Sequence, residues 1–159
     1  MSDTIVDGTT RVAWVASIAN PAAPTTTELN GGIDLTPRIT ADGLKLDPST
    51  ADVDTSSLAS TFDTKEVGRV SYDVELTFKR GTTTPEDLPY ATLRRGVHGY
   101  LVVRRNLAYT TAWASGQQIE VYLMACGEPA NVPPAANETG KFKSPMKVTV
   151  EPNTYVTVA

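Results

Sequence analysis

The chain has 159 residues, of which 40% are hydrophobic and 20% are charged, and its net charge at pH 7 is −4. This composition is ordinary for a globular protein. The length suits one compact core and hardly two, so we expect a single domain over residues 1–159. No apolar run approaches a membrane span, and the first residues lack the basic start and apolar core of a signal peptide. A lone cysteine, Cys126, cannot form an internal disulfide. Together these features indicate assembly in the cytoplasm and no membrane partner.

The charge is unevenly distributed along the chain. Residues 1–65 hold nine acidic and four basic side chains, whereas residues 66–159 hold nine acidic and ten basic ones. An acidic half and a balanced half suggest faces with different neighbours. Because no basic stripe dominates, the pattern does not indicate a tight DNA-binding protein.

The first part of the chain predicts two strands behind a polar arm. We expect this N-terminal arm, residues 1–10, to be mobile until a partner orders it. Apolar side chains alternate over residues 11–18, which predicts a strand. A Pro/Thr-rich loop over residues 20–27 leads to a second strand over residues 33–40, where Pro37 favours an edge or a bulge.

Residues 42–65 are rich in Asp, Ser and Thr and hold few large apolar side chains, so the sequence predicts a long irregular loop. A loop of this length inside a compact domain is usually functional or ordered by a partner. Its acids Asp47, Asp52 and Asp54 are compatible with a calcium site by type alone. Their spacing lacks the glycine and the terminal glutamate of an EF-hand loop, so we interpret them as solvated loop acids.

The clearest periodicity follows this loop. From residue 70 to residue 79, apolar and polar side chains alternate without a break, which is typical of a strand with one dry and one wet face. The predicted dry face consists of Val70, Tyr72, Val74, Leu76 and Phe78.

A short helix is predicted next. Thr84 can cap it, Pro85 suits its first position, and Asp87 is placed for a capping box. Pro89 argues against a regular helix over the whole segment, so the regular part could begin near it. Gly96 suits a left-handed stop.

The rest of the chain continues as strands, predicted over residues 100–105, 118–126, 141–150 and 154–158. About seven strands, one short helix and no βαβ rhythm indicate a mainly β fold. We expect an antiparallel β-sandwich or barrel with one short flanking helix.

Residues typical of catalysis are scarce. His98 is the only histidine and stands at a predicted strand start, whereas the usual catalytic constellations depend on a well-placed base. Cys126 ends an apolar strand, as a quiet buried thiol would. Zinc ligands are too few, and no glycine-rich phosphate motif is present. We therefore expect no active site, no metal and no cofactor.

Four segments carry a resemblance through their order: ITADGLKLDPSTADVDTSSLASTFDTK, VSYDVELTFKRG, YATLRRGVHGYLVVRR and QIEVYLMACGEP, which cover roughly residues 38–129. In this order they resemble the major tail tube proteins of long-tailed (siphovirus-like) bacteriophages, of the kind common in phages of actinobacteria. The order of the segments is the signal, since none of them is a specific motif alone.

The resemblance implies a non-enzymatic virion subunit with a β-sandwich flanked by a helix. Six copies would form a ring in which one sheet of each subunit joins a barrel around a channel. Rings would stack into a tube through long loops and terminal arms, so residues 42–65 would be an inter-ring loop containing Asp47, Asp52 and Asp54. Many relatives carry an immunoglobulin-like domain at the C-terminus, for which residues 1–159 leave no room.

The resemblance also implies partners. These are further copies of the chain, the tape measure protein, the tail terminator, distal tail proteins, and double-stranded DNA that passes through the lumen without specific binding. An acidic lumen repels phosphates, so DNA would slide through it. Asp73, Glu75 and Glu120 each lie on the polar face of a predicted strand and are therefore candidate lumen residues, with ordinary outer-surface charge as the alternative interpretation.

Two other functions remain open. A tail terminator or a head–tail joining protein would stop after one ring, whereas a tube protein continues to grow. A carbohydrate-binding β-sandwich could use Trp14, Trp113 and Tyr109 as stacking platforms, although Trp14 falls on a periodic apolar face that indicates core.

Overall fold

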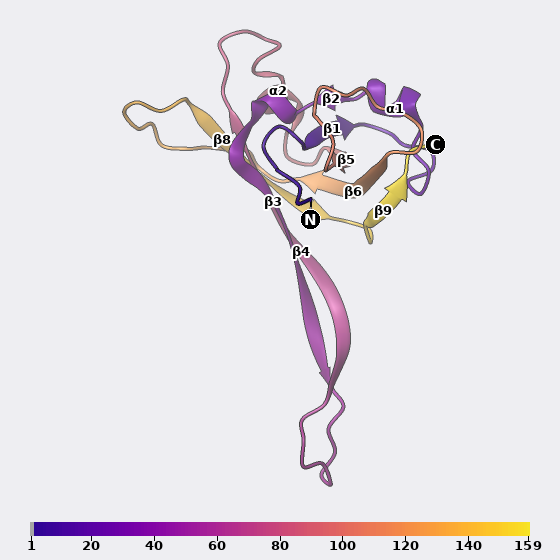
Figure 1. Ribbon diagram of the computed structural model, residues 1–159. Coiled ribbons are helices and arrows are strands. Elements are labelled where there is room, and N and C mark those ends of the chain that lie inside the picture. The colour runs from indigo at the N-terminus through magenta and orange to yellow at the C-terminus, as the bar shows by residue number, and fades with distance from the viewer. Residues whose placement is uncertain (1) are drawn as a thin grey trace.

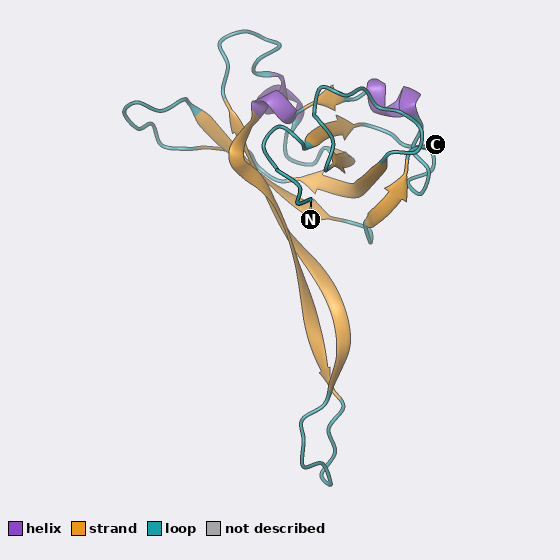
Figure 2. Cartoon of the chain, viewed as in Figure 1, coloured by secondary structure: helices purple, strands orange, loops and turns teal. Residues whose placement is uncertain are grey.

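The computed structural model describes residues 2–159, and Met1, the first residue of the expected N-terminal arm, lies outside the described residues. Strands dominate it (Figure 1, Figure 2). None of the helices within residues 2–159 is long and apolar enough to cross a membrane. In chain order the elements are β1 (Arg11–Val15), α1 (Thr26–Asn30), β2 (Ile33–Asp34), the 3₁₀ helix η1 (Thr36–Arg38), β3 (Ile39–Asp54), β4 (Lys65–Lys79), α2 (Leu88–Thr92), β5 (His98–Arg104), β6 (Gln118–Cys126), β7 (Ala130–Asn131), β8 (Lys141–Val148) and β9 (Asn153–Thr157).

All strands belong to one antiparallel sheet in the order β2-β1-β5-β6-β8-β4-β3, with β7 beside β8 and β9 beside β6. The two outermost strands, β2 and β3, are separated in the chain only by residues 35–38. Because a chain spans at most about 3.3–3.6 Å per residue, this connection forces the two ends of the sheet together. The sheet therefore curls into a barrel-like body, from which the β3–β4 hairpin projects (Figure 1).

The inside of the curled sheet holds the larger of two apolar clusters. Val12 and Trp14 of β1 belong to the same cluster as Leu76 and Phe78 of β4, although these strands lie far apart in the sheet order. The ring of Phe78 stacks on that of Phe142, with ring centroids 5.1 Å apart. Full burial of side chains of this size contributes about 1.5–3 kcal/mol each, so this cluster is a main source of the body's stability.

A second apolar cluster covers the outer face of the central strands. Val102 of β5 and Val121 of β6 pack there with Leu29 of α1, Trp113 and Val158. The central strands are thus covered on both faces. In contrast, β4 and β8 bury alternate side chains inside and leave a polar face outside.

The predicted fold class is confirmed, since the chain is mainly β with an antiparallel, barrel-like sheet. The strand predicted over residues 118–126 coincides with β6. The predicted dry face is buried from Val74 to Phe78, but Val70 is 52% exposed. Burial ends there because β4 leaves the body.

The expectation of a single helix was wrong. Helix α1 begins inside the predicted loop of residues 20–27 and continues to Asn30. Thr25 and Glu28 form a capping box at its start, and Leu29 is buried against the sheet. The capping box and one buried leucine stabilise a five-residue helix among prolines.

The regular part of the predicted helix begins near Pro89, as expected, but the predicted cap at Thr84 was wrong. Helix α2 begins at Leu88, close to Pro89, and not directly after Thr84. Asp87 makes no side-chain capping bond there, because its carboxylate accepts a hydrogen bond from Nε of Arg80 at 2.7 Å.

The prediction of an irregular loop over residues 42–65 was wrong. Strand β3 continues to Asp54 and β4 begins at Lys65, so only residues 55–64 lack strand structure. The backbone ladder between β3 and β4 forms this ribbon, and such a ladder does not require apolar side chains. Polar and small residues are tolerated because both faces of the ribbon meet solvent.

Candidate assembly surfaces

The arm, defined here as residues 47–73, is the part of the β3–β4 hairpin that stands clear of the body. Strand β8 pairs with β4 only from Val74 to Lys79, so beyond Val74 the two strands have only each other as sheet neighbours. Figure 1 shows the arm extending well away from the other elements. A two-stranded ribbon is at best marginally stable in water, so the arm gains most from a partner that covers it.

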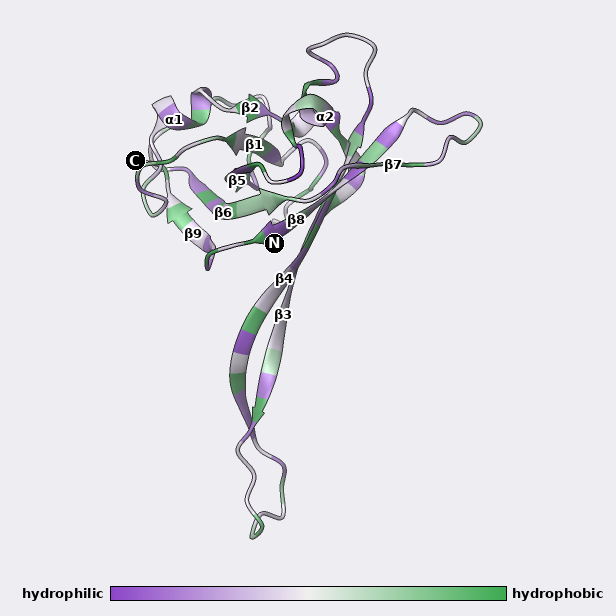
Figure 3. Cartoon of the chain, turned by 180° about the vertical axis from the view of Figure 1, so that it is seen from behind, coloured by the Kyte–Doolittle hydropathy of each residue, from purple (hydrophilic) through white to green (hydrophobic). Residues whose placement is uncertain are grey.

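One face of β4 carries a run of apolar side chains in the arm. Tyr72 and Val70 continue the line of inward-facing side chains beyond Val74. Val70 and Val67 are 52% and 70% exposed. Seen from behind, hydrophobic and hydrophilic segments alternate along the arm (Figure 3). The arm therefore presents apolar surface that nothing in its own chain covers.

A β-bulge keeps this face continuous. Thr50 pairs with Val70 and Asp52 pairs with Val67, so β4 has one more residue than β3 in this interval. Without the bulge, Val67 would point to the opposite face, since it lies three positions from Val70. Gly68 is required here because a Cβ at this position would lie 2.7 Å from the carbonyl oxygen of Ala51.

The loop at the end of the arm, residues 55–64, is held by polar side chains. The hydroxyls of Thr55 and Thr64 hydrogen-bond at 2.8 Å, and the Thr64 N–H donates to Oγ of Ser56 at 2.9 Å. The Ser56 N–H donates to the Asp54 carboxylate at 2.9 Å, a bond that lowers the pKa of Asp54. These bonds give the loop a defined shape although it is exposed.

Two large apolar side chains project from this loop. The exposed fraction of Leu58 is 107%, and that of Phe62 is 79%. Large apolar side chains that are this exposed within one short loop commonly mark a contact site. We call residues 55–64 with these two side chains the tip.

A groove of about 760 Å³ lies at the root of the arm, between residues 68–72 and residues 147–154. We call it the root groove. Val70 and Val150 line it and are 52% and 56% exposed. Its charged lining residues are Arg69, Lys147 and Glu151.

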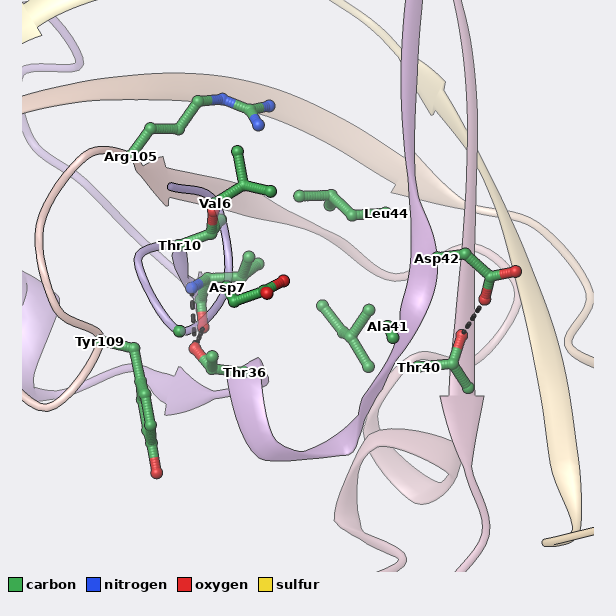
Figure 4. Close-up of a pocket in the computed structure, with 13 residues that line it drawn as sticks. Val6, Asp7, Thr10, Thr36, Thr40, Ala41, Asp42, Leu44, Arg105 and Tyr109 are labelled. Atoms are coloured by element: carbon green, nitrogen blue, oxygen red, sulfur yellow. Dashed lines mark hydrogen bonds between the residues drawn. The ribbon is translucent and has the colours of Figure 1, made fainter. Parts of the chain in front are cut away.

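A second, smaller groove of about 430 Å³ lies between the N-terminal segment and the start of β3 (Figure 4). We call it the N-terminal groove. Val6 and Leu44 supply apolar surface, and Thr40 donates a hydrogen bond to the Asp42 carboxylate at 3.3 Å. Its charged lining residues are Asp7, Asp42 and Arg105.

Two of the candidate lumen residues lie together on the outer face of β4. Asp73 accepts a hydrogen bond from Lys45 at 2.9 Å, and Glu75 lies 3.6 Å from Nζ of Lys143. The hydrogen bond from Lys45 lowers the pKa of Asp73. The acids on this face are thus interspersed with lysines.

The third candidate, Glu120, is not brought together with the other two. It pairs across the sheet with Val103 and therefore points to the inside of the curled sheet. Its carboxylate accepts hydrogen bonds from the Tyr122 hydroxyl and from Nε of Arg105, both at 2.6 Å. Burial and this bond to Glu120 raise the pKa of Tyr122.

The acids predicted to lie in the long loop are on a strand. Asp47, Asp52 and Asp54 belong to the part of β3 that forms the arm. Asp47 pairs across the ribbon with Asp73, and Asp52 lies 3.4 Å from Nζ of Lys65. Across residues 2–159, no group of His, Cys, Asp or Glu side chains is arranged to hold a metal ion.

The aromatic side chains do not form a carbohydrate platform. Trp14 and Trp113 are only 3% and 5% exposed, which confirms the core position predicted for Trp14. Trp113 packs beside the guanidinium of the buried Arg104, 4.9 Å from its ring centroid. Only Tyr109 of the proposed trio is accessible, with 40% exposure.

The two residues considered for catalysis are an exposed histidine and a buried cysteine. His98 is exposed at the start of β5. Cys126 is buried in the inner cluster, and burial raises the pKa of its thiol to about 11, so the thiolate form is disfavoured.

A family model described as "Phage tail tube protein" matches residues 1–159. The chain belongs to the phage tail tube protein family. No curated protein matches it. The fold is shared with a chain of the "Cryo-EM structure of the anti-feeding prophage (AFP) baseplate, 6-fold symmetrised", with a TM-score of 0.59 and 10% identity over 96% of this chain and 96% of that chain.

Family membership makes this tail tube protein a structural subunit of the virion tail that assembles into a multi-subunit structure. Tail tube proteins are generally not enzymes. The exposed surfaces of the arm and the two grooves are therefore considered as places where subunits meet.

Proposed function

We propose that the chain is the repeating subunit of a tail tube in which hexameric rings stack around a lumen that conducts the viral genome into the host. Assembly takes place in the host cytoplasm. The tape measure protein, the tail terminator and the distal tail proteins are the further partners, and double-stranded DNA passes through without specific binding. The family match over the whole chain supports this proposal.

The arm is the observation that carries the stacking part of the proposal. It stands clear of the body and exposes apolar side chains on one face and at its tip. A contact made by a projecting element on one side and received on another side is head-to-tail, and repeated head-to-tail contacts that do not close produce a filament. The inter-ring element is thus proposed to be this hairpin, which includes Asp47, Asp52 and Asp54.

The experiment removes residues 50–70, which are most of the arm, and shortens both strands together. Ser49 and Ser71 are paired, so replacing residues 50–70 by Asn-Gly joins them through a two-residue hairpin turn and leaves no strand unpaired. Negative-stain electron microscopy at increasing protein concentration then compares the variant with the unaltered chain. We expect hollow filaments of uniform width from the unaltered chain, and single rings or monomers with unchanged thermal unfolding from the variant.

Two results would change the proposal. Tubes of normal length from the shortened variant would mean that the arm does not form the inter-ring contact. Closed single rings from the unaltered chain at every concentration would favour a tail terminator or a head–tail joining protein.

For the lumen, we propose Asp73 and Glu75, which share the outer face of β4. The double variant Asp73→Asn with Glu75→Gln should assemble normally but slow genome ejection, because Lys45 and Lys143 lose the acids that neutralise them and then attract phosphates. Glu120→Gln is the matched control, since Glu120 points to the opposite side of the sheet. Normal ejection by the double variant would contradict the assignment of Asp73 and Glu75 to the lumen.

A further inference from the structure

The tip cannot fill the grooves of its own chain. Leu58 and Phe62 belong to the loop of residues 55–64 at the far end of the arm (Figure 1). The root groove is lined by residues 68–72 and 147–154, where the arm meets the body. The ribbon between them is paired to its end, at Asp54 and Lys65, so it cannot fold back without losing its backbone ladder. Any groove that receives the tip therefore belongs to another molecule.

The tip is ordered by hydrogen bonds within its own loop before it contacts another molecule. Its hydrogen bonds fix the loop before binding, so a docking partner does not have to supply all of the ordering free energy. Leu58 and Phe62 are the apolar side chains that such a contact would remove from water. Asp54 and Asp63 flank them, and with Lys65 as the basic residue beside them, the end of the arm keeps a negative balance.

Charge distinguishes the two grooves. The root groove has two basic residues, Arg69 and Lys147, and one acid, whereas the N-terminal groove has two acids, Asp7 and Asp42, and one basic residue. The acids at the end of the arm, Asp54 and Asp63, would be attracted by the first groove and repelled by the second. The root groove is also the larger, at about 760 Å³ against about 430 Å³.

We infer that the tip of one copy docks into the root groove of a second copy. Leu58 and Phe62 pack against the apolar lining at Val70 and Val150, and the acids at the end of the arm face the basic residues of the groove. The inference rests on the proposed function, because it names the surface that receives the inter-ring arm. It is a heterologous contact, which each copy makes once as donor and once as acceptor.

Cysteine cross-linking tests this contact. Two single variants, Leu58→Cys and Val150→Cys, are mixed and oxidised, then run on a non-reducing gel. Val6→Cys, which samples the N-terminal groove, is the matched control. The native Cys126 is buried and does not compete.

We expect a disulfide-linked dimer from the mixture of Leu58→Cys with Val150→Cys that neither variant gives alone. The mixture with Val6→Cys should give none. A dimer with Val6→Cys only, or no dimer in either mixture, would overturn the inference. Hollow filaments in the reduced samples would then mean that the tube proposal holds although the docking inference has failed. Their absence would count against the tube proposal as well.

A charge exchange tests the same contact without cysteine. Asp63→Lys and Lys147→Asp should each lower the pelletable polymer by about tenfold or more, because each places like charges together. The double variant should restore most of the polymer. Unchanged polymer in both single variants, or no recovery in the double variant, would contradict the pairing of tip and groove.

Discussion

The body and the arm share one sheet but are stabilised differently. In the body, Leu76 and Phe78 of β4 are fully buried, whereas in the arm Val70 and Val67, on the same face of that strand, are 52% and 70% exposed. Backbone pairing continues from one region to the other, but burial does not. Apolar burial therefore stabilises the body, while the arm keeps its apolar surface available for another molecule.

Ion pairs do not compensate for the missing burial. In the arm, Lys65 and Asp52 lie 3.4 Å apart with side chains 61% and 67% exposed, and such pairs contribute about 0–1 kcal/mol. In the body, Arg80 and Asp87 lie 2.7 Å apart with side chains 32% and 25% exposed. The comparison predicts that substitutions of similar chemistry have large effects in the body and small effects in the arm.

The largest effect is expected from Phe78→Ala in the body. The side chain is fully buried and stacks on Phe142, so the substitution removes apolar burial and leaves a cavity. We expect the free energy of unfolding to fall by about 3–5 kcal/mol in denaturant titrations. A loss below about 1 kcal/mol would mean that the inner cluster is not the main source of stability.

A second test compares two neighbouring arginines of the body. Arg104 is 1% exposed, and its guanidinium donates to the carbonyl oxygens of Ala108, Thr111 and Ala112. Arg104→Ala leaves these acceptors without that donor, and we expect a loss of about 2–3 kcal/mol.

Arg105→Ala is the matched control for this test. The Arg105 side chain is 48% exposed in its ion pair with Glu120, and we expect a loss of about 1 kcal/mol or less. Equal losses at both positions in thermal or denaturant unfolding would contradict a role for the buried guanidinium in fixing the loop after β5.

A third, smaller effect depends on pH. Hydrogen bonds from Arg80 hold the pKa of Asp87 below its ordinary value of 3.8. Because the folded-state pKa is depressed, the stabilisation is complete above 3.8 and is lost as the pH falls below that value through the folded-state pKa. Asp87→Asn should cost about 1 kcal/mol at neutral pH.

The pH dependence separates this pair from the exposed pair of Asp73 with Lys45. The stability difference between Asp87→Asn and the unaltered chain should disappear in acid. Asp73→Asn should show a much weaker dependence, because the Asp73 side chain is 72% exposed. Parallel stability curves for Asp87→Asn and the unaltered chain down to acid pH would contradict the coupling.

The sequence predicts the body better than the arm, and for a physical reason. Alternation reports which side chains are buried, so it located β6 and the buried half of β4. The distal half of β3 is polar on both faces, and its strand structure comes from backbone pairing with β4, which no side-chain pattern reports. Gly68 in a strand was the available signal for the bulge.

The candidate lumen residues and the contact surface at the tip were also only partly predictable from the sequence. Alternation placed Asp73, Glu75 and Glu120 on polar sides of their strands, but the side of the sheet depends on the register with neighbouring strands. Pairing with Val103 turns Glu120 inward. Leu58 and Phe62 are two of the few large apolar side chains within residues 42–65, yet only the projecting hairpin makes them a contact surface.

The smallest effect is expected from Phe62→Ala, the counterpart of Phe78→Ala in the arm. Phe62 is 79% exposed, so its truncation removes little buried surface, and the free energy of unfolding should change by no more than about 0.5 kcal/mol. Denaturant titration of the monomer measures the free energy of unfolding. Sedimentation of the same preparation at higher protein concentration measures the amount of polymer. Lost polymer with unchanged stability would show that this apolar side chain serves assembly and not folding. A loss of stability close to that of Phe78→Ala would instead mean that the tip packs against its own chain, and the distinction between body and arm would fail.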